Sequence, residues 1–237
     1  MFATCTGLFY LTLGRLQAAE LAFQNILSPM QREYMLAAVA FARGDVPGMR
    51  RHMERYVSLT GASAAIAFPT ELMLRAGLVS AAEKQIATRE KEHFSNHHLP
   101  SLLGEVALAR GKRAEAIALL EEGDRLLQQT GSAGYFMAAE SLADALQQRG
   151  KMDRAVDVLQ VAAQQNVRTF NMPRPAGYFW LRTQAQLAQL YRKNGRAQDA
   201  EKIEDDLRRL LAYADPDHAL LAQLKEKQSS SSPRAAR

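Results

Sequence analysis

Small and large residues recur in a fixed order around six glycines of this chain. The glycines lie 30 to 45 residues apart and are Gly14, Gly44, Gly77, Gly111, Gly150 and Gly195. Small residues stand seven positions before them, namely Gly7, Ala37, Thr70, Gly104, Ala143 and Ala188. Five positions after them stand Ala19, Met49, Ala82, Ala116, Ala155 and Ala200, of which only Met49 is large. Nine positions after the first five glycines come Phe23, Met53, Ile86, Leu120 and Leu159.

This order predicts six helical hairpins, each made of two antiparallel helices joined at a glycine. A glycine commonly ends a helix because the left-handed conformation costs it no side-chain strain. Small residues are needed where paired helices cross, and large apolar residues fill the next layer. The first four hairpins are expected at about residues 1–27, 31–59, 63–92 and 101–129, the fifth ends near 166, and the sixth follows a proline-containing insertion at 167–177.

Besides the second copy with Met49, two further copies depart from this order. Pro69 and Thr70 fall in the first helix of the third copy and are expected to interrupt it. In the sixth copy Glu204 takes the place of the large apolar residue, with Ile203 beside it as the alternative occupant. The glycine intervals still match arrays of helical pairs, so the repeat interpretation covers all six copies.

The register resembles the tetratricopeptide repeat over roughly residues 1 to 213. The resemblance implies an all-α, right-handed α-solenoid of about six helix-turn-helix repeats. It also implies a protein-binding or peptide-binding scaffold that uses a concave face and has no enzymatic activity. Solenoids add one layer per repeat without a second core, so a single domain is expected.

The segment after the sixth repeat carries its own helix signals. Asp215, Pro216 and Asp217 provide an N-cap, a proline at the first helical position and an acid on the helix dipole. They predict a capping helix to about Lys227 that covers the last repeat, because the ends of solenoids need cover. The expected domain therefore spans residues 1–227, and the serine-rich residues 228–237 are expected to form a disordered basic tail.

Residues 210–221 also resemble the closing segment of repeat regions in bacterial multidomain signalling proteins. Those regions follow a serine/threonine kinase domain or a winged-helix DNA-binding domain. The chain itself holds no glycine-rich loop, His-Arg-Asp or Asp-Phe-Gly motif of a kinase. Two functions therefore stay open: a binding scaffold, and a sensory or regulatory module separated from its effector domain.

The resemblance places the peptide groove on the first helix of each hairpin. The candidate binding residues at its inward positions are Tyr34, Phe41, Glu71, Arg75, Glu105, Glu140, Asp144, Arg182 and Arg192. In chain order this set passes from apolar to acidic to basic. Carboxylates gathered on a concave wall concentrate cations, so the expected ligand is a basic or amphipathic segment. The chain's own tail, with Lys225, Lys227, Arg234 and Arg237, is an internal candidate for this ligand.

The first hairpin offers a second interaction surface. It starts at Met1 without a cap and carries Phe2, Leu8 and Leu11 near an open end. Because the open end of a solenoid needs a polar face or a covering element, we expect either additional chain before Met1 or self-association here.

The net charge of +5 does not by itself indicate a nucleic-acid ligand. The tail from Lys225 onward has four basic residues against one glutamate, a net +3, which leaves +2 for the repeats. There the basic residues alternate with acidic ones, as on an ordinary solvated surface. With no apolar run of about 18 residues for a membrane span and no basic region before the apolar start, a cytoplasmic location is expected.

The residues that could carry chemistry do not form a known catalytic or metal-binding constellation. His93 and His97 would share a helix face, but no third ligand is near them and Pro100 follows closely. Cys5, the only cysteine, lies in an apolar stretch and is expected to be a core residue. The sequence therefore predicts no cofactor, no metal and no catalytic residue.

Overall fold

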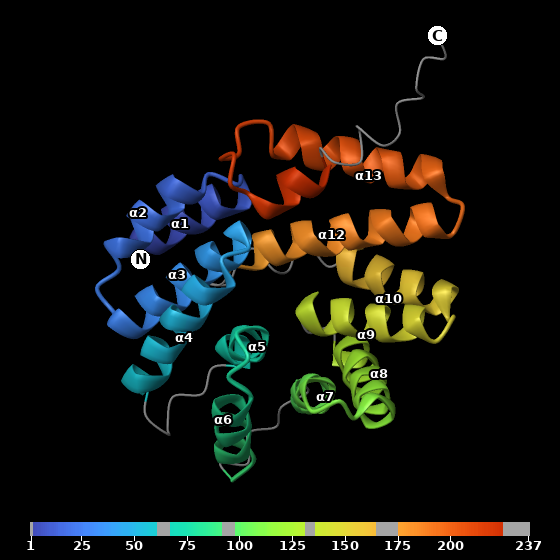
Figure 1. The fold of residues 1–237 in the computed structure, drawn as a ribbon, viewed down its shortest axis with the longest axis horizontal. Helices are drawn as coiled ribbons and strands as arrows, with labels where there is room; N and C mark the ends of the chain where they lie inside the picture. Colours follow the sequence, from blue (N-terminus) through green and yellow to red (C-terminus); the bar gives the residue numbers. More distant parts are fainter. Residues whose placement is uncertain (1, 61–66, 92–97, 131–135, 165–174, 225–237) are drawn as a thin grey trace.

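A computed structural model describes residues 2–60, 67–91, 98–130, 136–164 and 175–224, and all structural statements below concern these ranges (Figure 1). Within them the regular structure is entirely helical. The helices are α1 (Phe2–Thr12), α2 (Leu16–Gln24), α3 (Pro29–Arg43), α4 (Val46–Thr60), α5 (Ala67–Arg75), α6 (Val79–Lys91), α7 (Leu99–Ala109), α8 (Arg113–Thr130), α9 (Phe136–Gln148), α10 (Met152–Gln164), α12 (Ala176–Lys193) and α13 (Ala197–Leu210). A short last helix covers residues 219–224.

The six predicted hairpins are confirmed, and each has its glycine at the turn. All six glycines have positive φ angles, between 73° and 76°. This left-handed conformation is the one in which a residue with a side chain is strained. At Gly44, for example, the amide donates to the Phe41 carbonyl and the next amide, of Asp45, donates to the Ala40 carbonyl. The all-α repeat fold is therefore built on the predicted turns.

The spacing of small and large residues is explained by contacts across each hairpin. A Cβ atom on Gly7 would lie 2.2 Å from Cε1 of Phe23, and one on Gly104 would lie 2.7 Å from Cγ of Leu120. In both pairs the small residue precedes the turn glycine by seven positions and the large one follows it by nine. The small residue is thus required because the large side chain of the partner helix occupies its space.

Both departures from the pattern are accommodated. Pro69 lies in the first turn of α5, where a missing amide donor breaks no helical bond, so the helix is not interrupted as predicted. Glu204 itself, and not Ile203, occupies the core position of the sixth hairpin, with an exposed fraction of 1%. Its two carboxylate oxygens accept bonds of 2.9 and 2.7 Å from the Arg192 guanidinium, which compensates the buried charge.

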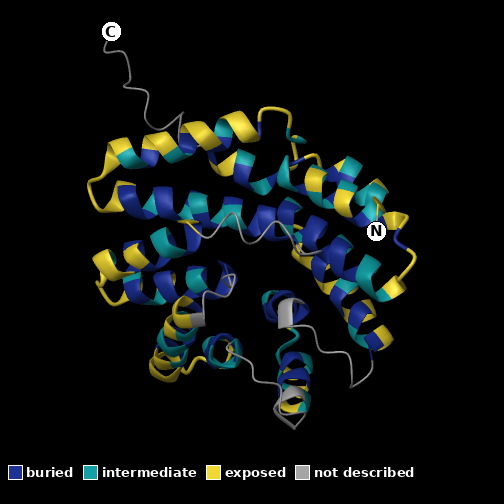
Figure 2. Cartoon of the chain, turned by 180° about the vertical axis from the view of Figure 1, so that it is seen from behind, coloured by how far each residue is buried: buried dark blue, intermediate teal, exposed yellow. Residues whose placement is uncertain are grey.

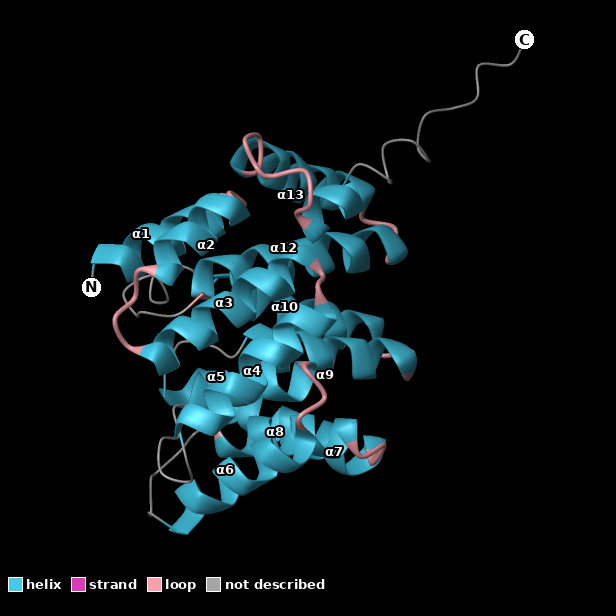
Figure 3. Ribbon diagram, turned by 60° about the vertical axis from the view of Figure 1, so that its left-hand side comes forward, coloured by secondary structure: helices cyan, strands magenta, loops and turns pink. Residues whose placement is uncertain are grey.

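The array of hairpins closes on itself, which the repeat pattern does not predict. Helix α3 contacts α5, α5 contacts α7, α7 contacts α9, α9 contacts α12, and α12 contacts α1. These first helices are arranged around a common centre, and the first and last hairpins lie at the same end of the molecule (Figures 1 and 3). The Phe41 ring lies 6.1 Å from the Tyr178 ring and 6.3 Å from the Phe179 ring. Aromatic packing therefore joins the second hairpin to the sixth.

Helix α12 is buried along much of its length, whereas exposed residues gather on α13 and other outer helices (Figure 2). One continuous apolar cluster contains residues of α1 to α5 together with residues of α12, α13 and the last helix. The core thus runs across the closure and not only between neighbours in the sequence.

The segment after α13 packs on the last repeat, as the sequence predicts, and also reaches further. The His218 ring lies 5.8 Å from the Tyr178 ring of α12, and the segment also contacts the turns of the first and second hairpins. Asp215 is not the N-cap of the last helix, because that helix begins at residue 219. Its carboxylate instead accepts a hydrogen bond of 2.7 Å from the backbone amide of Gln17, at the start of α2.

Candidate functional site: a polar pocket inside the closed array

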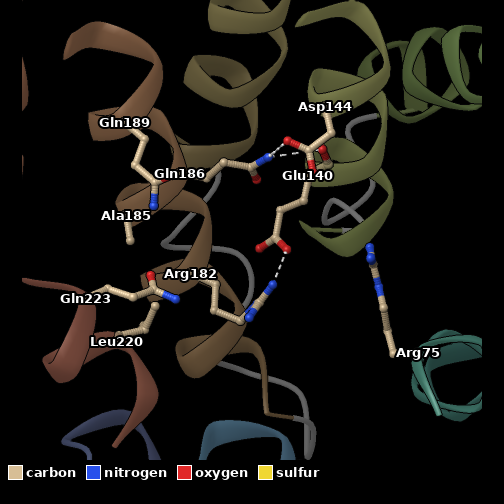
Figure 4. Close-up of a pocket in the computed structure, with 9 residues that line it drawn as sticks. All are labelled: Arg75, Glu140, Asp144, Arg182, Ala185, Gln186, Gln189, Leu220 and Gln223. Carbon is tan, nitrogen blue, oxygen red and sulfur yellow. Dashed lines mark hydrogen bonds and ion pairs between the residues drawn. The ribbon is translucent and has the colours of Figure 1, made fainter. Parts of the chain in front are cut away.

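A pocket of about 200 Å³ opens between α5, α9, α12 and the last helix (Figure 4). Its lining residues are mostly polar: Arg75, Glu140, Asp144, Arg182, Ala185, Gln186, Gln189, Leu220 and Gln223. Four of them, Arg75, Glu140, Asp144 and Arg182, belong to the set predicted to form a binding groove. They come together because helical spacing puts them on the inward sides of α5, α9 and α12.

The ion pair between Arg182 and Glu140 forms the centre of the pocket. The Arg182 guanidinium donates to a Glu140 carboxylate oxygen at 2.9 Å, and the Thr183 hydroxyl donates to the other at 3.4 Å. Only 5% of the Glu140 side chain is exposed. Burial is the largest single influence on the pKa of Arg182 and lowers it, but the charge and hydrogen bond of Glu140 together with Tyr178 outweigh burial, so the pKa is raised. The Arg182 guanidinium also lies 4.5 Å from the centre of the Phe41 ring.

Arg75 ties α5 to α9 on the opposite side of the pocket. Its guanidinium donates to the Met137 carbonyl at 3.0 Å and to the Ser141 hydroxyl at 2.7 Å. It also lies 3.5 Å from the Glu105 carboxylate of α7. Burial raises the pKa of Glu105 although Arg75 opposes the shift. Arg75 therefore connects three neighbouring hairpins by one charged group.

Asp144 and the glutamines leave hydrogen-bonding capacity in the pocket. The Gln186 side-chain amide donates to Asp144 Oδ1 at 2.7 Å and to the Glu140 carbonyl at 3.2 Å. Burial, first of all, raises the pKa of Asp144, although the bond from Gln186 opposes it. In the described part of the chain, Asp144 has no ion pair within 4.0 Å, and the Gln189 and Gln223 side chains have no hydrogen bond. These three side chains are the ones available to a guest.

The other predicted groove residues do not reach the pocket. Tyr34 and Glu71 are buried in the interior, and Arg192 is engaged by Glu204 within its own hairpin. Phe41 contacts the Arg182 guanidinium but does not line the pocket. Only part of the predicted acidic strip lies at this surface: Glu140 and Asp144 line the pocket, whereas Glu71 and Glu105 do not.

Sequence reasoning missed Ala185, Gln186, Leu220 and Gln223 as lining residues. Gln186 could have been found, since it lies four residues after Arg182 and hence on the same face of α12. Leu220 and Gln223 had no signal, because their position depends on where the last helix packs.

The cysteine and histidine residues considered for catalysis or metal binding are not part of a described site. Cys5 is exposed, so its prediction as a core residue is wrong; it lies on the outer stripe of α1 with Phe2 and Phe9. His93 and His97 fall outside the described residues. In the described ranges no group of three or more His, Cys, Asp or Glu side chains is arranged for a metal ion. None of the helices described is long and apolar enough to cross a membrane.

A scan against protein-family models finds no match to this sequence, and a search of curated proteins finds none either. Several solved structures are similar to it. TPR-like repeats assigned to a kinesin light chain of Podosopora anserina share 23% identity, with 81% of this chain and 100% of that chain covered and a TM-score of 0.41. The MamA protein shares 14% identity, with 88% and 98% covered and a TM-score of 0.40. At such identities and TM-scores, the matches say nothing about what the chain binds.

Proposed function

We propose that the chain is a protein-interaction scaffold without catalytic activity, and that a partner segment inserts a side chain into the polar pocket. The observation that supports this most directly is the convergence of Arg75, Glu140, Asp144 and Arg182, from three separate hairpins, on one opening. The pocket volume of about 200 Å³ is below the range of roughly 300–1,000 Å³ typical of small-molecule sites. It therefore suits one side chain of a larger partner better than a whole cofactor.

The charges of the pocket favour a guest that donates hydrogen bonds. Each arginine already has a carboxylate partner, Arg182 in Glu140 and Arg75 in Glu105. Asp144 keeps acceptor capacity, and the side-chain carbonyls of Gln189 and Gln223 add two acceptors. A lysine or arginine side chain has only donors and a positive charge, so a basic segment is the ligand that matches this arrangement.

A change at Asp144 tests the pocket without unfolding the protein. Charge reversal at Glu140 would leave Arg182 buried without a partner, a change that typically destabilises a fold strongly. Asp144→Asn keeps the shape and removes only the charge. We expect it to weaken binding of an arginine-containing peptide about tenfold, equivalent to about 1.4 kcal/mol, in isothermal titration calorimetry. The matched control is Asp157→Asn, an exposed position on α10 of the same hairpin. Equal affinity of the two variants would exclude the pocket as the binding site.

The outer face of the first hairpin is a second candidate surface, for another copy of the chain. Phe2 and Phe9 are 86% and 61% exposed on one stripe of α1, a helix with no charged residue. Large apolar side chains normally lie buried, and an uncharged face can pair with itself without desolvating charges. We expect sedimentation velocity to detect dimers that Phe2→Ser with Phe9→Ser abolishes and that Leu59→Ser on α4 leaves intact. A purely monomeric wild-type protein at high concentration would exclude this surface.

A further inference from the structure

Residues 214–224, here called the clasp segment, add a second set of contacts between the two ends of the array, separate from the packing of Phe41 on α12. The Asp215 amide donates to the Gly14 carbonyl at 2.9 Å. The Asp215 carboxylate accepts from the Gln17 amide at 2.7 Å, at the start of α2, where the N-cap residue Arg15 makes no side-chain capping bond. A residue 198 positions away thus supplies the cap that α2 lacks.

A second anchor lies at the turn of the second hairpin. Asp217 accepts from the Arg43 guanidinium at 2.9 Å, and the same guanidinium donates to Glu20 at 2.6 Å. The Ala219 methyl lies 3.8 Å from where a Cβ atom on Gly44 would be. The clasp segment therefore packs over two turn glycines. A hydrogen bond of Asp215 holds it near Gly14, and the ion pair of Asp217 holds it near Gly44.

Apolar side chains complete the contact on the inner side. Leu220 and Leu224, one helical turn apart, are buried in the cluster that joins the two ends of the chain. Leu220 also lines the pocket together with Gln223. The clasp segment thus forms one wall of the pocket, and its position decides how accessible the pocket is.

His218 makes the docked position costly. It has an exposed fraction of 0%, and its ring lies 5.8 Å from the Tyr178 ring. Neither of its ring nitrogens has a hydrogen-bond partner in the described chain. A buried polar group without a partner loses its hydration with no compensation, so docking of the clasp segment is weaker than its other contacts would make it.

The closure of the array does not depend on the clasp segment. Phe41 meets Tyr178, Phe179 and the Arg182 guanidinium directly. Helix α12 also contacts α1 without it. The clasp segment can therefore leave while the hairpins stay joined.

We propose that the turns of the first two hairpins form a segment-binding site, occupied in this structure by the chain's own clasp segment, and that release of this segment opens the pocket. The site recognises an aspartate that caps α2, a second aspartate for Arg43, and two leucines one helical turn apart. This inference rests on the proposed function only for the use of the pocket, because the contacts of the clasp segment stand independently of any ligand.

The test measures access to the pocket with a cysteine probe, so it needs no ligand. In a Cys5→Ser background, Ala185→Cys places the only thiol at the pocket wall, and its rate of alkylation by iodoacetamide is measured. We expect Asp215→Ala with Asp217→Ala to raise this rate about tenfold, since each change removes a hydrogen bond to a charged group. The matched control is Asp205→Ala with Asp206→Ala, two exposed acids of α13 whose arginine partners lie within the same helix.

Two further measurements separate release from unfolding. A cysteine at Ala155, which is fully buried between α9 and α10, should keep its slow rate in the Asp215→Ala, Asp217→Ala protein. A synthetic peptide of residues 211–227, added in trans, should restore protection of the pocket cysteine. An unchanged rate at position 185, an equal rise at position 155, or no effect of the peptide would each overturn the proposal. None of these results depends on whether Asp144→Asn weakens peptide binding.

Discussion

The turns of the first two hairpins and those of the last three are alike in sequence and backbone but differ in surroundings. Gly14 and Gly44 have φ angles of 73° and 75°, and Gly111, Gly150 and Gly195 lie between 74° and 76°. A Cβ atom on Gly14 would lie 2.6 Å from Ala214 Cβ and 3.0 Å from Leu211 Cδ2. At the last three turns nothing lies within 4 Å of such an atom.

The comparison separates two reasons for a glycine that a sequence cannot distinguish. At Gly111 the backbone conformation alone requires it. At Gly14 the conformation and the close approach of another segment both require it. A repeat signature therefore identifies the hairpin. How strictly each turn requires glycine also depends on which other segment packs against it.

The largest expected effect comes from replacing the glycine at a covered turn and at an uncovered one. Gly14→Ala should destabilise the protein by about 2–5 kcal/mol, about 1–2 for the left-handed conformation and about 1–3 for overlap with Ala214. Gly111→Ala should cost only about 1–2 kcal/mol, because it meets the conformational strain alone. Urea denaturation of the two variants measures the difference. Equal losses would mean that the clasp segment does not press on the first turn.

A pH dependence sharpens the comparison, since the buried His218 lies against the turn at Gly14. Burial lowers the pKa of His218 to about 4, while nearby Asp217 and Asp215 oppose the shift. The unfolded chain therefore takes up a proton first, near the ordinary value of about 6.5. Stability should fall as the pH drops from about 6.5 to about 4, by up to about 3 kcal/mol from this group.

His218→Leu isolates that contribution. Tyr178, Asp215 and Asp217 are the titratable groups that face the ring. Urea denaturation at pH 7 and at pH 4.5 gives the free energy of unfolding of wild type and of His218→Leu. Subtracting the two pH dependences cancels the contribution of all other titratable groups. Parallel losses in the two proteins would show that docking of the clasp segment does not keep His218 neutral.

The smallest expected effect concerns the register that all six hairpins share. Ala155 is fully buried where α9 and α10 cross, so Ala155→Leu should overpack the contact and cost about 1–3 kcal/mol. Gln128, near the end of α8, is exposed and donates to Asp124, so Gln128→Leu should cost no more than about 0.5 kcal/mol. Coinciding thermal melts would contradict the register.

Local features were predictable because they are decided within one hairpin. The turn glycines and the contact of Gly7 with Phe23 each involve residues close in sequence. Four of the predicted groove residues reached the pocket for the same reason. Their helical spacing fixed the side of each first helix on which they lie.

The closure was not predictable, because it depends on small rotations between repeats that add up along the chain. Phe41 and Tyr178 belong to different hairpins, and nothing in either one indicates the other. The ion pair of Glu204 with Arg192 was missed because a carboxylate at an apolar position looks like a break in the pattern. The partners that satisfy it become visible only when the second helix is folded back.

The bond between Gln17 and Asp215 has a consequence for the order of events during synthesis. The two residues are 198 positions apart, so translation at roughly 5–20 residues per second separates their emergence from the ribosome by about 10–40 s. For that time the start of α2 has no cap and the turn at Gly14 has no cover, while five further hairpins are produced behind it. The first hairpin thus completes its contacts only after the last residues of the clasp segment have been made.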